Sequence, residues 1–316
     1  MHEWEEMRDF IAETHGPNHP MTQIELFSWF FCRRHNKNHA NVLIARDNGQ
    51  LVSLLGYLPT SFLLENEFID GAWMAHWMTL KSYRHGIGAI LMRRMTELYS
   101  VVAGQGASNM NKPIAKKLGY SFDDSLKKAV FLFDSEILKI NFNSDYENSI
   151  TPFCTRLDYK THVKKLTLIN YDPNWSFYSE LAFSTLRNRD YLNSRYAFFP
   201  FHDYTIMVEG PRDKPTLCIF RIVNTNIGLK VGRIVEYLTP TESATKSEGC
   251  PILIQCISIM KEKGVAYIDF YTSSKNYLNK FIYSGFVEDA CGVLPSLLDP
   301  IDPSRKFQNC EVFVET

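Results

Sequence analysis

A basic loop with two glycines is the stretch of the sequence best suited to chemistry. Lys81, Arg84 and His85 supply three basic side chains, and Gly86 and Gly88 come directly after them. Glycine lets a backbone approach a ligand closely, and the first N–H groups of a helix have no partner inside that helix. Together with the helix dipole they attract anions. The pattern predicts a phosphate or pyrophosphate site, although a simple strand–turn–helix would also use glycines for its bend.

An apolar strand and an amphipathic helix must hold this loop in place. Residues 73–80 are almost wholly apolar, which is typical of a strand buried on both faces. After the loop, apolar residues recur at steps of three and four, which predicts a helix over residues 87–98. These residues are Ile87, Ile90, Leu91, Met95 and Leu98.

The residues around the loop resemble the GNAT superfamily of acetyl-CoA-dependent N-acetyltransferases. In that family a strand, the motif [Gln/Arg]-x-x-Gly-x-[Gly/Ala] and a helix follow one another, and the loop holds the pyrophosphate of CoA. Here residues 83–88 read Tyr-Arg-His-Gly-Ile-Gly, so Tyr83 takes the first position unless a one-residue deletion brings Arg84 there. Residues 101–107 and 109–122 resemble the family's fifth strand, its last helix and the Leu-Gly-[Phe/Tyr] that ends it. The resemblance covers roughly residues 40–135.

The resemblance implies direct transfer of an acetyl group from acetyl-CoA to an amine. An alkylamine has a pKa of about 10.4 in water, so a base must remove a proton from it. In this family a backbone N–H of the central strand, here near Met78, donates to the developing oxyanion. Asn109 and Asn111 could contact CoA or cap the helix that they begin. The expected cofactor contacts are Trp77, Met78, Thr79, Arg84, His85, Gly86, Ile87, Gly88, Ala89, Asn109 and Asn111.

The catalytic side chains cannot be carried over from the family. Its early strand glutamate falls on Ala72 or Trp73, and its frequent tyrosine acid falls on Ala115. His76 is the only titratable side chain inside the strand and is our first candidate for the base, although a hydrogen-bonded core histidine explains it equally well. Asp70, at the start of the strand, is the second candidate.

Composition narrows the class of protein. The 316 residues indicate two domains, and 34 Lys and Arg against 35 Asp and Glu, without blocks of either sign, argue against a nucleic-acid partner. The sequence shows neither a signal peptide nor an apolar run of membrane length, and its seven cysteines lack any Cys-x-x-Cys. We therefore expect a cytoplasmic protein with free thiols and no membrane insertion.

Two histidine pairs have a spacing that metal ligands also use. His15 and His19 straddle a Gly-Pro break, and His35 and His39 lie at a helix end and in a loop. Neither pair has an evident third ligand. We expect solvated loop histidines and no metal.

The second half of the chain repeats the order strand, helix, strand, helix, Gly-Phe. We therefore expect an α+β fold of two GNAT-like domains, each a central mixed, mostly antiparallel sheet flanked by helices. Residues 1–145 would bind acetyl-CoA, and residues 150–316 would form an acceptor-binding or structural domain. The link over residues 238–250 lacks Gly-x-Gly and carries two glutamates, so it should repel a pyrophosphate. In detail we expect helices over 3–14, 21–34 and 176–186, and a strand over 127–134 that ends the first domain. Asp47-Asn48-Gly49 predicts a hairpin turn between strands over 42–46 and 51–58.

Buried charges in the second half suggest an acceptor site. Glu236 and Asp269 lie on apolar strands, and acids are rarely buried without partners such as Arg221 and Arg233. With Tyr271 these residues form either a structural network, which we favour slightly, or an acceptor-binding set. A further group of basic and aromatic residues would suit a uracil or thymine ring with a diphosphate. That group is Arg189, Tyr191, Arg195 and Tyr196.

The resemblance to tandem GNAT-type chains implies a small-molecule acceptor. Such chains look like enzymes that acetylate small metabolites, including nucleotide-linked amino sugars for surface polysaccharides such as lipopolysaccharide. A UDP- or dTDP-linked amino sugar is therefore the expected acceptor. The alternatives are a peptide or protein amine, or a degenerate GNAT fold that only binds a partner. Dinucleotide binding is a weaker reading because the third glycine of that fingerprint is missing.

Overall fold

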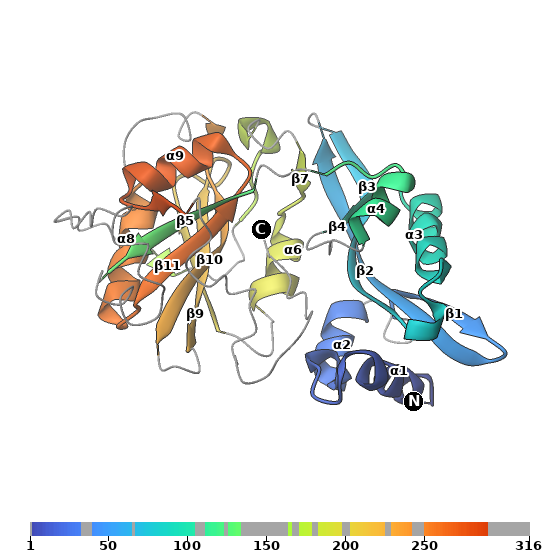
Figure 1. Cartoon of the computed structure of the whole chain (residues 1–316). Helices are drawn as coiled ribbons and strands as arrows, with labels where there is room; N and C mark the ends of the chain where they lie inside the picture. The colour runs from blue at the N-terminus through green and yellow to red at the C-terminus, as the bar shows by residue number, and fades with distance from the viewer. Residues whose placement is uncertain are drawn as a thin grey trace. The chain divides into compact units, whose positions relative to one another are not determined.

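The computed structural model describes residues 2–32, 40–64, 67–104, 111–122, 126–133, 164–165, 171–178, 183–197, 203–224, 229–241 and 250–289. It shows an α+β chain with two mixed sheets (Figure 1). Contacts within the chain divide it into two units. Unit 1 comprises residues 1–122 and 182–186, and unit 2 comprises residues 123–181 and 187–316.

The sheet of unit 1 is built around two long strands. Its order is β1-β2-β3-β4, and β7 pairs with β2. Neighbouring strands are antiparallel except β3 and β4, which are parallel. Asn48 and Gly49, both at positive φ, form the tight turn between β1 and β2, so the predicted hairpin is confirmed. The strands are β1 (Val42–Asp47), β2 (Gln50–Leu64), β3 (Glu67–Thr79), β4 (Val101–Gly104) and β7 (Phe183–Thr185).

Helices cover both faces of this sheet. Three elements, α1 (His2–His15), the 3₁₀ turn η1 (Pro20–Thr22) and α2 (Ile24–Phe31), pack on the face that carries His76 and Met78 of β3. On the other face lies α3 (Ile87–Leu98), whose first turn meets Trp77. The predicted helix over 87–98 is therefore confirmed, whereas the helix expected over 21–34 is shorter at its start. Residues 33–39, with His35 and His39, lie outside the described residues.

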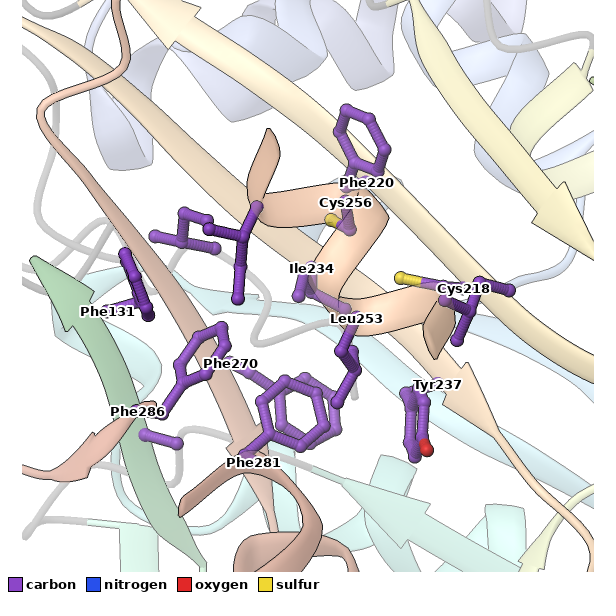
Figure 2. Packing of buried hydrophobic residues seen from close by; sticks show 14 of the residues in the cluster. Phe131, Cys218, Phe220, Ile234, Tyr237, Leu253, Cys256, Phe270, Phe281 and Phe286 are labelled. Atoms are coloured by element: carbon purple, nitrogen blue, oxygen red, sulfur yellow. The ribbon is translucent and has the colours of Figure 1, made fainter. Parts of the chain in front are cut away.

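Unit 2 is a seven-stranded sheet with helices on both faces, and the short segments α6 (Arg189–Leu192) and η6 (Asn193–Ala197) pack on the face that carries Ile219 and Val235. Its order is β12-β5-β11-β10-β9-β8-β6, and β10 and β11 are its parallel pair. The helices α8 (Pro251–Glu262) and α9 (Lys275–Tyr283) bury the main core, where the ring of Phe270 stacks on that of Phe281 at 4.0 Å (Figure 2). The strands are β5 (Lys127–Leu132), β6 (Lys164–Lys165), β8 (Tyr204–Glu209), β9 (Thr216–Asn224), β10 (Lys230–Leu238), β11 (Tyr267–Thr272) and β12 (Val287–Glu288).

The repeated plan expected from the sequence is present in both units. In unit 1, α3 connects the parallel strands β3 and β4, and α4 (Asn111–Lys117) then ends at Gly119, followed by Tyr120. In unit 2, α8 connects the parallel strands β10 and β11, and α9 ends at Gly285, followed by Phe286. Gly119 and Gly285 have φ values of 89° and 96°, which suit the glycine that ends a helix.

Two expected elements take different places. The strand expected over 127–134 to end the first domain is β5, and it lies in the sheet of unit 2 between β11 and β12. The helix expected over 176–186 is wrong. That stretch contains the 3₁₀ turn η5 (Trp175–Tyr178) and then β7. Because β1 pairs with β2 only as far as Gly56, the far end of β2 has a free edge, and β7 occupies it at residues 62–64.

Candidate functional site

The first turn of α3 has backbone donors available for a ligand. Gly86 is its N-cap residue and offers no side-chain cap, and the first turn contains no acidic residue. The carbonyl of Gly86 accepts bonds from the amides of Ala89 and Ile90. For the amides of Ile87 and Gly88, the described part of the chain provides no acceptor. Two N–H groups and the positive end of the helix dipole are therefore available for an anion.

The two glycines of the loop have different physical roles. Gly86 has φ 133°, which disfavours any side chain, and a Cβ built there would meet nothing within 4 Å. A Cβ at Gly88 would lie 2.3 Å from the indole ring of Trp77. Gly86 thus provides the turn and open space before the helix, while Gly88 lets α3 pack closely against β3. The sequence led us to expect a ligand close to the backbone of Gly88, but in the structure the side chain of Trp77 occupies that space.

Basic side chains surround this helix start. Arg84 and His85 are exposed, and Arg84 Nε donates to the carbonyl of Thr79 at 3.2 Å. The ring of Tyr83 stacks on that of His85, and the hydroxyl of Tyr83 donates to the carboxylate of Asp47 at 2.7 Å. The loop is thereby attached to β3 and to the β1–β2 turn, so its positive groups are held beside the free amides.

The described pairing of β3 with β4 stops before β3 reaches this loop. Their pairing runs from Gly71 opposite Val101 to Met74 opposite Gly104, where β4 ends. Strand β3 continues for five residues, to Thr79. Along these five residues, no strand in the described ranges pairs with the edge of β3 that faces away from β2. The free edge leads directly to the loop and the start of α3.

A β-bulge lies in the same five residues. Leu55 of β2 is opposite Trp77 while Gly56 is opposite Ala75, so His76 has no residue across from it. His76 has φ 50°, a left-handed conformation that is uncommon for a residue other than glycine. Strain of this kind persists only where the surrounding structure enforces it, and it clusters at functional sites. The sequence did not indicate this bulge.

Three histidines gather over the bulge. The ring of His19 lies 5.3 Å from that of His15 and 5.6 Å from that of His76. Phe30 and Phe31 of α2 close the other side of the His76 ring, at 6.2 and 6.0 Å. His19 is 5% exposed, so the expectation of solvated loop histidines is wrong for it. Its Nδ1 accepts a bond from the amide of Met21, and η1 thereby fixes the ring.

Burial keeps this histidine cluster neutral. Burial, and to a smaller extent the neighbouring histidines, lower the pKa of His19 to about 4 and that of His76 to about 3. The pKa of His15 is also lowered, first by burial and then by the positive charge of Arg84. His76 is therefore a neutral proton acceptor at pH 7, but a weak one.

Tyr120 is a candidate that the sequence reasoning missed. Its hydroxyl lies 3.9 Å from the sulfur of Met74, the last residue of β3 that pairs with described residues of β4. Burial raises the pKa of this half-buried tyrosine, so the hydroxyl keeps its proton at neutral pH. Tyr120 follows the Gly119 that ends α4, and that Leu-Gly-Tyr signal was visible in the sequence. The position of the family's tyrosine acid instead falls on Ala115, which has no proton to donate.

Other predicted residues of unit 1 are placed as follows. Asp70 is exposed on β3 and is separated from His76 by five residues, about 20 Å along a strand. Met78 is buried, and the hydroxyl of Thr79 bonds to that of Ser53. Asn109 lies outside the described residues. Asn111 begins α4, but its side chain is likewise outside them.

The charged residues predicted for the acceptor form closed pairs in unit 2. Arg233 donates through Nε and Nη2 to Asp269 at 3.0 and 2.9 Å, which confirms that pairing. Glu236 accepts from Arg187 at 2.5 Å and from the hydroxyl of Tyr196 at 2.8 Å. The second partner is therefore Arg187, and the expectation that Arg221 would take that role is wrong.

The aromatic groups predicted for the acceptor have different exposures. The ring of Tyr271 lies 5.5 Å from the guanidinium of Arg233. Tyr196 is 2% exposed and Arg189 is exposed. The network around Glu236 and Asp269 thus supports the structural reading more than the acceptor reading.

The described residues contain no group of three histidine, cysteine or acidic side chains that could hold a metal ion. Within the same ranges no helix is long and apolar enough to cross a bilayer.

Comparisons with known proteins identify the fold. No family model matches the sequence, and no curated protein matches it at the sequence level. A GCN5-related N-acetyltransferase from Anabaena variabilis aligns with a TM-score of 0.58 at 14% identity, over 92% of this chain and 69% of that one. A probable N-acyltransferase from Enterococcus faecalis gives 0.53 at 15% identity, over 85% and 62%. N-myristoyltransferase from Saccharomyces cerevisiae gives 0.50 at 11% identity, over 90% and 76%. Together with the two mixed sheets flanked by helices, these likenesses show that the chain has the fold of the GNAT superfamily.

Proposed function

We propose that the chain is an acyl-CoA-dependent N-acyltransferase and that unit 1 binds acetyl-CoA. The observation that carries the proposal is the uncapped start of α3 at the end of the free edge of β3. The amides of Ile87 and Gly88, with Arg84 and His85 beside them, suit a diphosphate. Over residues 75–79, the edge of β3 that faces away from β2 pairs with no strand of the described ranges, and such an edge suits an extended chain that carries amide groups, such as pantetheine.

The side chains at the bulge suit transfer of the acyl group to an amine. When bound, acetyl-CoA supplies a thioester. The acceptor nitrogen forms a bond to the acyl carbon while the carbon–sulfur bond breaks. As the nitrogen bonds to the acyl carbon, its N–H becomes acidic, and His76 takes that proton. Tyr120 donates its hydroxyl proton to the leaving sulfur. A backbone N–H near Met78 donates to the oxyanion.

His76 and Tyr120 approach the reaction from opposite faces of β3. Met74, which contacts Tyr120, belongs to the core between β3 and α3, whereas His76 faces α1 and α2. The nitrogen that attacks and the sulfur that leaves also lie on different sides of the acyl carbon. This arrangement supports separate roles for the two side chains.

For the acceptor we propose a nucleotide-linked amino sugar, carrying UDP or dTDP, in surface polysaccharide synthesis in the cytoplasm. The two-unit plan supports a small polar acceptor by analogy with tandem chains of this fold. A peptide amine is the second candidate. It is favoured by the likeness to N-myristoyltransferase, which extends over 90% of this chain and hence over both units.

Thermal unfolding with acetyl-CoA, followed by an assay for released CoA thiol, tests the proposal. At 100 times its dissociation constant, acetyl-CoA should stabilise the protein by about 2.7 kcal/mol. Arg84→Glu should weaken this effect. Arg93→Glu, which changes an exposed arginine of α3, should not.

The turnover arm compares 3- and 4-amino sugar nucleotides with peptides that have a free amino terminus. Release with sugars alone supports the first acceptor, and release with peptides alone supports the second. Stabilisation by acetyl-CoA without turnover of any amine would indicate a binding module. If acetyl-CoA neither stabilises the protein nor releases its thiol, the acyltransferase proposal fails.

A further inference from the structure

Unit 2 contains a row of polar residues that crosses four neighbouring strands. Tyr204 of β8 lies opposite Arg221 of β9, which lies opposite Arg233 of β10, which lies opposite Asp269 of β11. Directly opposed residues on neighbouring strands have their Cβ atoms about 4.5–5.5 Å apart, and like charges in this arrangement are destabilising. Arg221 and Arg233 are such a pair.

The two buried acids on this face cannot compensate Arg221. Asp269 is fully buried, and both of its oxygens are held by Arg233. Glu236 is 2% exposed, and its oxygens are held by Arg187 and Tyr196. The third buried acid of the described residues, Asp289, pairs with Lys128 at 3.2 Å. Within the residues that the structure describes, no carboxylate reaches Arg221.

The guanidinium of Arg221 is held with one edge open. Its Nη1 donates to the hydroxyl of Tyr204 at 3.4 Å, and the guanidinium lies 5.9 Å from the ring of Tyr204. The ring of Tyr196 packs against that of Tyr204 at 5.0 Å and so holds it in place. The Nε atom of Arg221 is buried and has no hydrogen-bond partner. Arg233 uses its Nε–Nη2 edge to bind the carboxylate of Asp269, whereas no residue in the described ranges accepts a bond from the same edge of Arg221.

We propose that Arg221 is a binding site for one oxyanion, a phosphate or a carboxylate of a small molecule, in unit 2. A guanidinium has five N–H donors, and its paired edge matches the two oxygens of a carboxylate or phosphate. Arg221 as a whole is partly buried. A bound anion would give Nε an acceptor and would offset the charge of the Arg221–Arg233 pair. This site does not depend on the binding of acetyl-CoA in unit 1.

Thermal unfolding in inorganic phosphate and in acetate, at constant ionic strength with chloride as the reference anion, tests the site. The variant is Arg221→Met, and the matched control is Arg212→Met, which removes an exposed arginine of unit 2 that lies 3.5 Å from Asp172. Any binding of phosphate at the start of α3 is common to both variants and cancels in their comparison. Phosphate or acetate should raise the melting temperature of the wild type and of Arg212→Met. In Arg221→Met, the anion concentration that gives half of the full rise in melting temperature should be at least about tenfold higher than in the wild type and in Arg212→Met.

The choice of anion and the behaviour in chloride add two further results. A larger effect of phosphate identifies a phosphoryl group as the natural ligand, and a larger effect of acetate identifies a carboxylate. In chloride alone, Arg221→Met should melt no lower than the wild type, because it removes an uncompensated cation beside Arg233. If the variant and the control respond equally to both anions, or if Arg221→Met alone is strongly destabilised in chloride, the proposal is overturned.

Discussion

The neutral histidine cluster predicts a steep loss of stability in mild acid. The folded protein binds fewer protons than the unfolded chain between pH 6.5, the ordinary pKa of histidine, and the lowered pKa values of about 4 for His19 and 3 for His76. Stability is therefore complete above pH 6.5 and decreases as the pH falls below it. Each unit of pH removes about 1.4 kcal/mol per histidine. At pH 5, 1.5 units below, the two histidines together should cost about 4 kcal/mol.

Urea denaturation at pH 7.5 and at pH 5, in wild type and in His76→Asn, measures this loss. Asparagine accepts the positive φ of His76 better than most residues do. The variant lacks the packing of the imidazole ring at both pH values. Between pH 7.5 and pH 5, however, its free energy of unfolding should fall by about 2 kcal/mol less than that of the wild type. His85→Asn removes an exposed loop histidine and should keep the full wild-type decrease. An equal decrease in wild type and His76→Asn would refute the idea that burial keeps His76 neutral.

Three further changes test individual contacts. Gly88→Ala places a Cβ against the indole of Trp77 and should lower the free energy of unfolding by about 1–3 kcal/mol; chemical denaturation measures it, and a neutral effect would show that α3 is not held by this contact. Glu236→Gln leaves the cation of Arg187 buried without its counter-ion and should cost about 3–5 kcal/mol, whereas the same change at the exposed Glu97 should cost less than about 1 kcal/mol; similar melting temperatures for the two variants would contradict the account. Tyr120→Phe removes the hydroxyl beside Met74 and should lower kcat about 100-fold or more with little change in the affinity for acetyl-CoA; an unchanged kcat would exclude Tyr120 as the acid.

Local patterns predicted the elements whose ends depend on local chemistry. The helix over 87–98 has the predicted bounds because its apolar periodicity starts directly after Gly86. The Asp47-Asn48-Gly49 turn predicted the first hairpin, since Asn and Gly tolerate positive φ. The Gly-Tyr and Gly-Phe ends of α4 and α9 revealed the repeat, because glycine is favoured where a helix stops.

Non-local pairing accounts for the errors. Strands β5 and β7 lie in sheets other than the ones that their sequence neighbours suggested, and no local pattern reports which edge a strand will join. A segment as short as Phe183–Thr185 does not show by its periodicity whether it is a strand or part of a helix. The bulge that leaves His76 without a residue across from it also depends on register and was not predictable.

A second bulge explains why the partner of Glu236 was misassigned. The register of β10 against β9 shifts between Ile234 and Glu236. Val235 therefore faces the same side as Leu238, and Glu236 also turns to that side, where Arg187 and Tyr196 lie. Simple alternation would have placed Glu236 in the apolar core with Ile234. The residue types correctly indicated a buried ion pair, but the register selected its partner.

A crystal structure with bound acetyl-CoA is the most direct test of the central claim, that the start of α3 holds the cofactor. We predict diphosphate oxygens within about 3 Å of the amides of Ile87 and Gly88, and the pantetheine chain along residues 75–79 of β3. A diphosphate bound at any other part of the chain, with these two amides still free, would contradict the account.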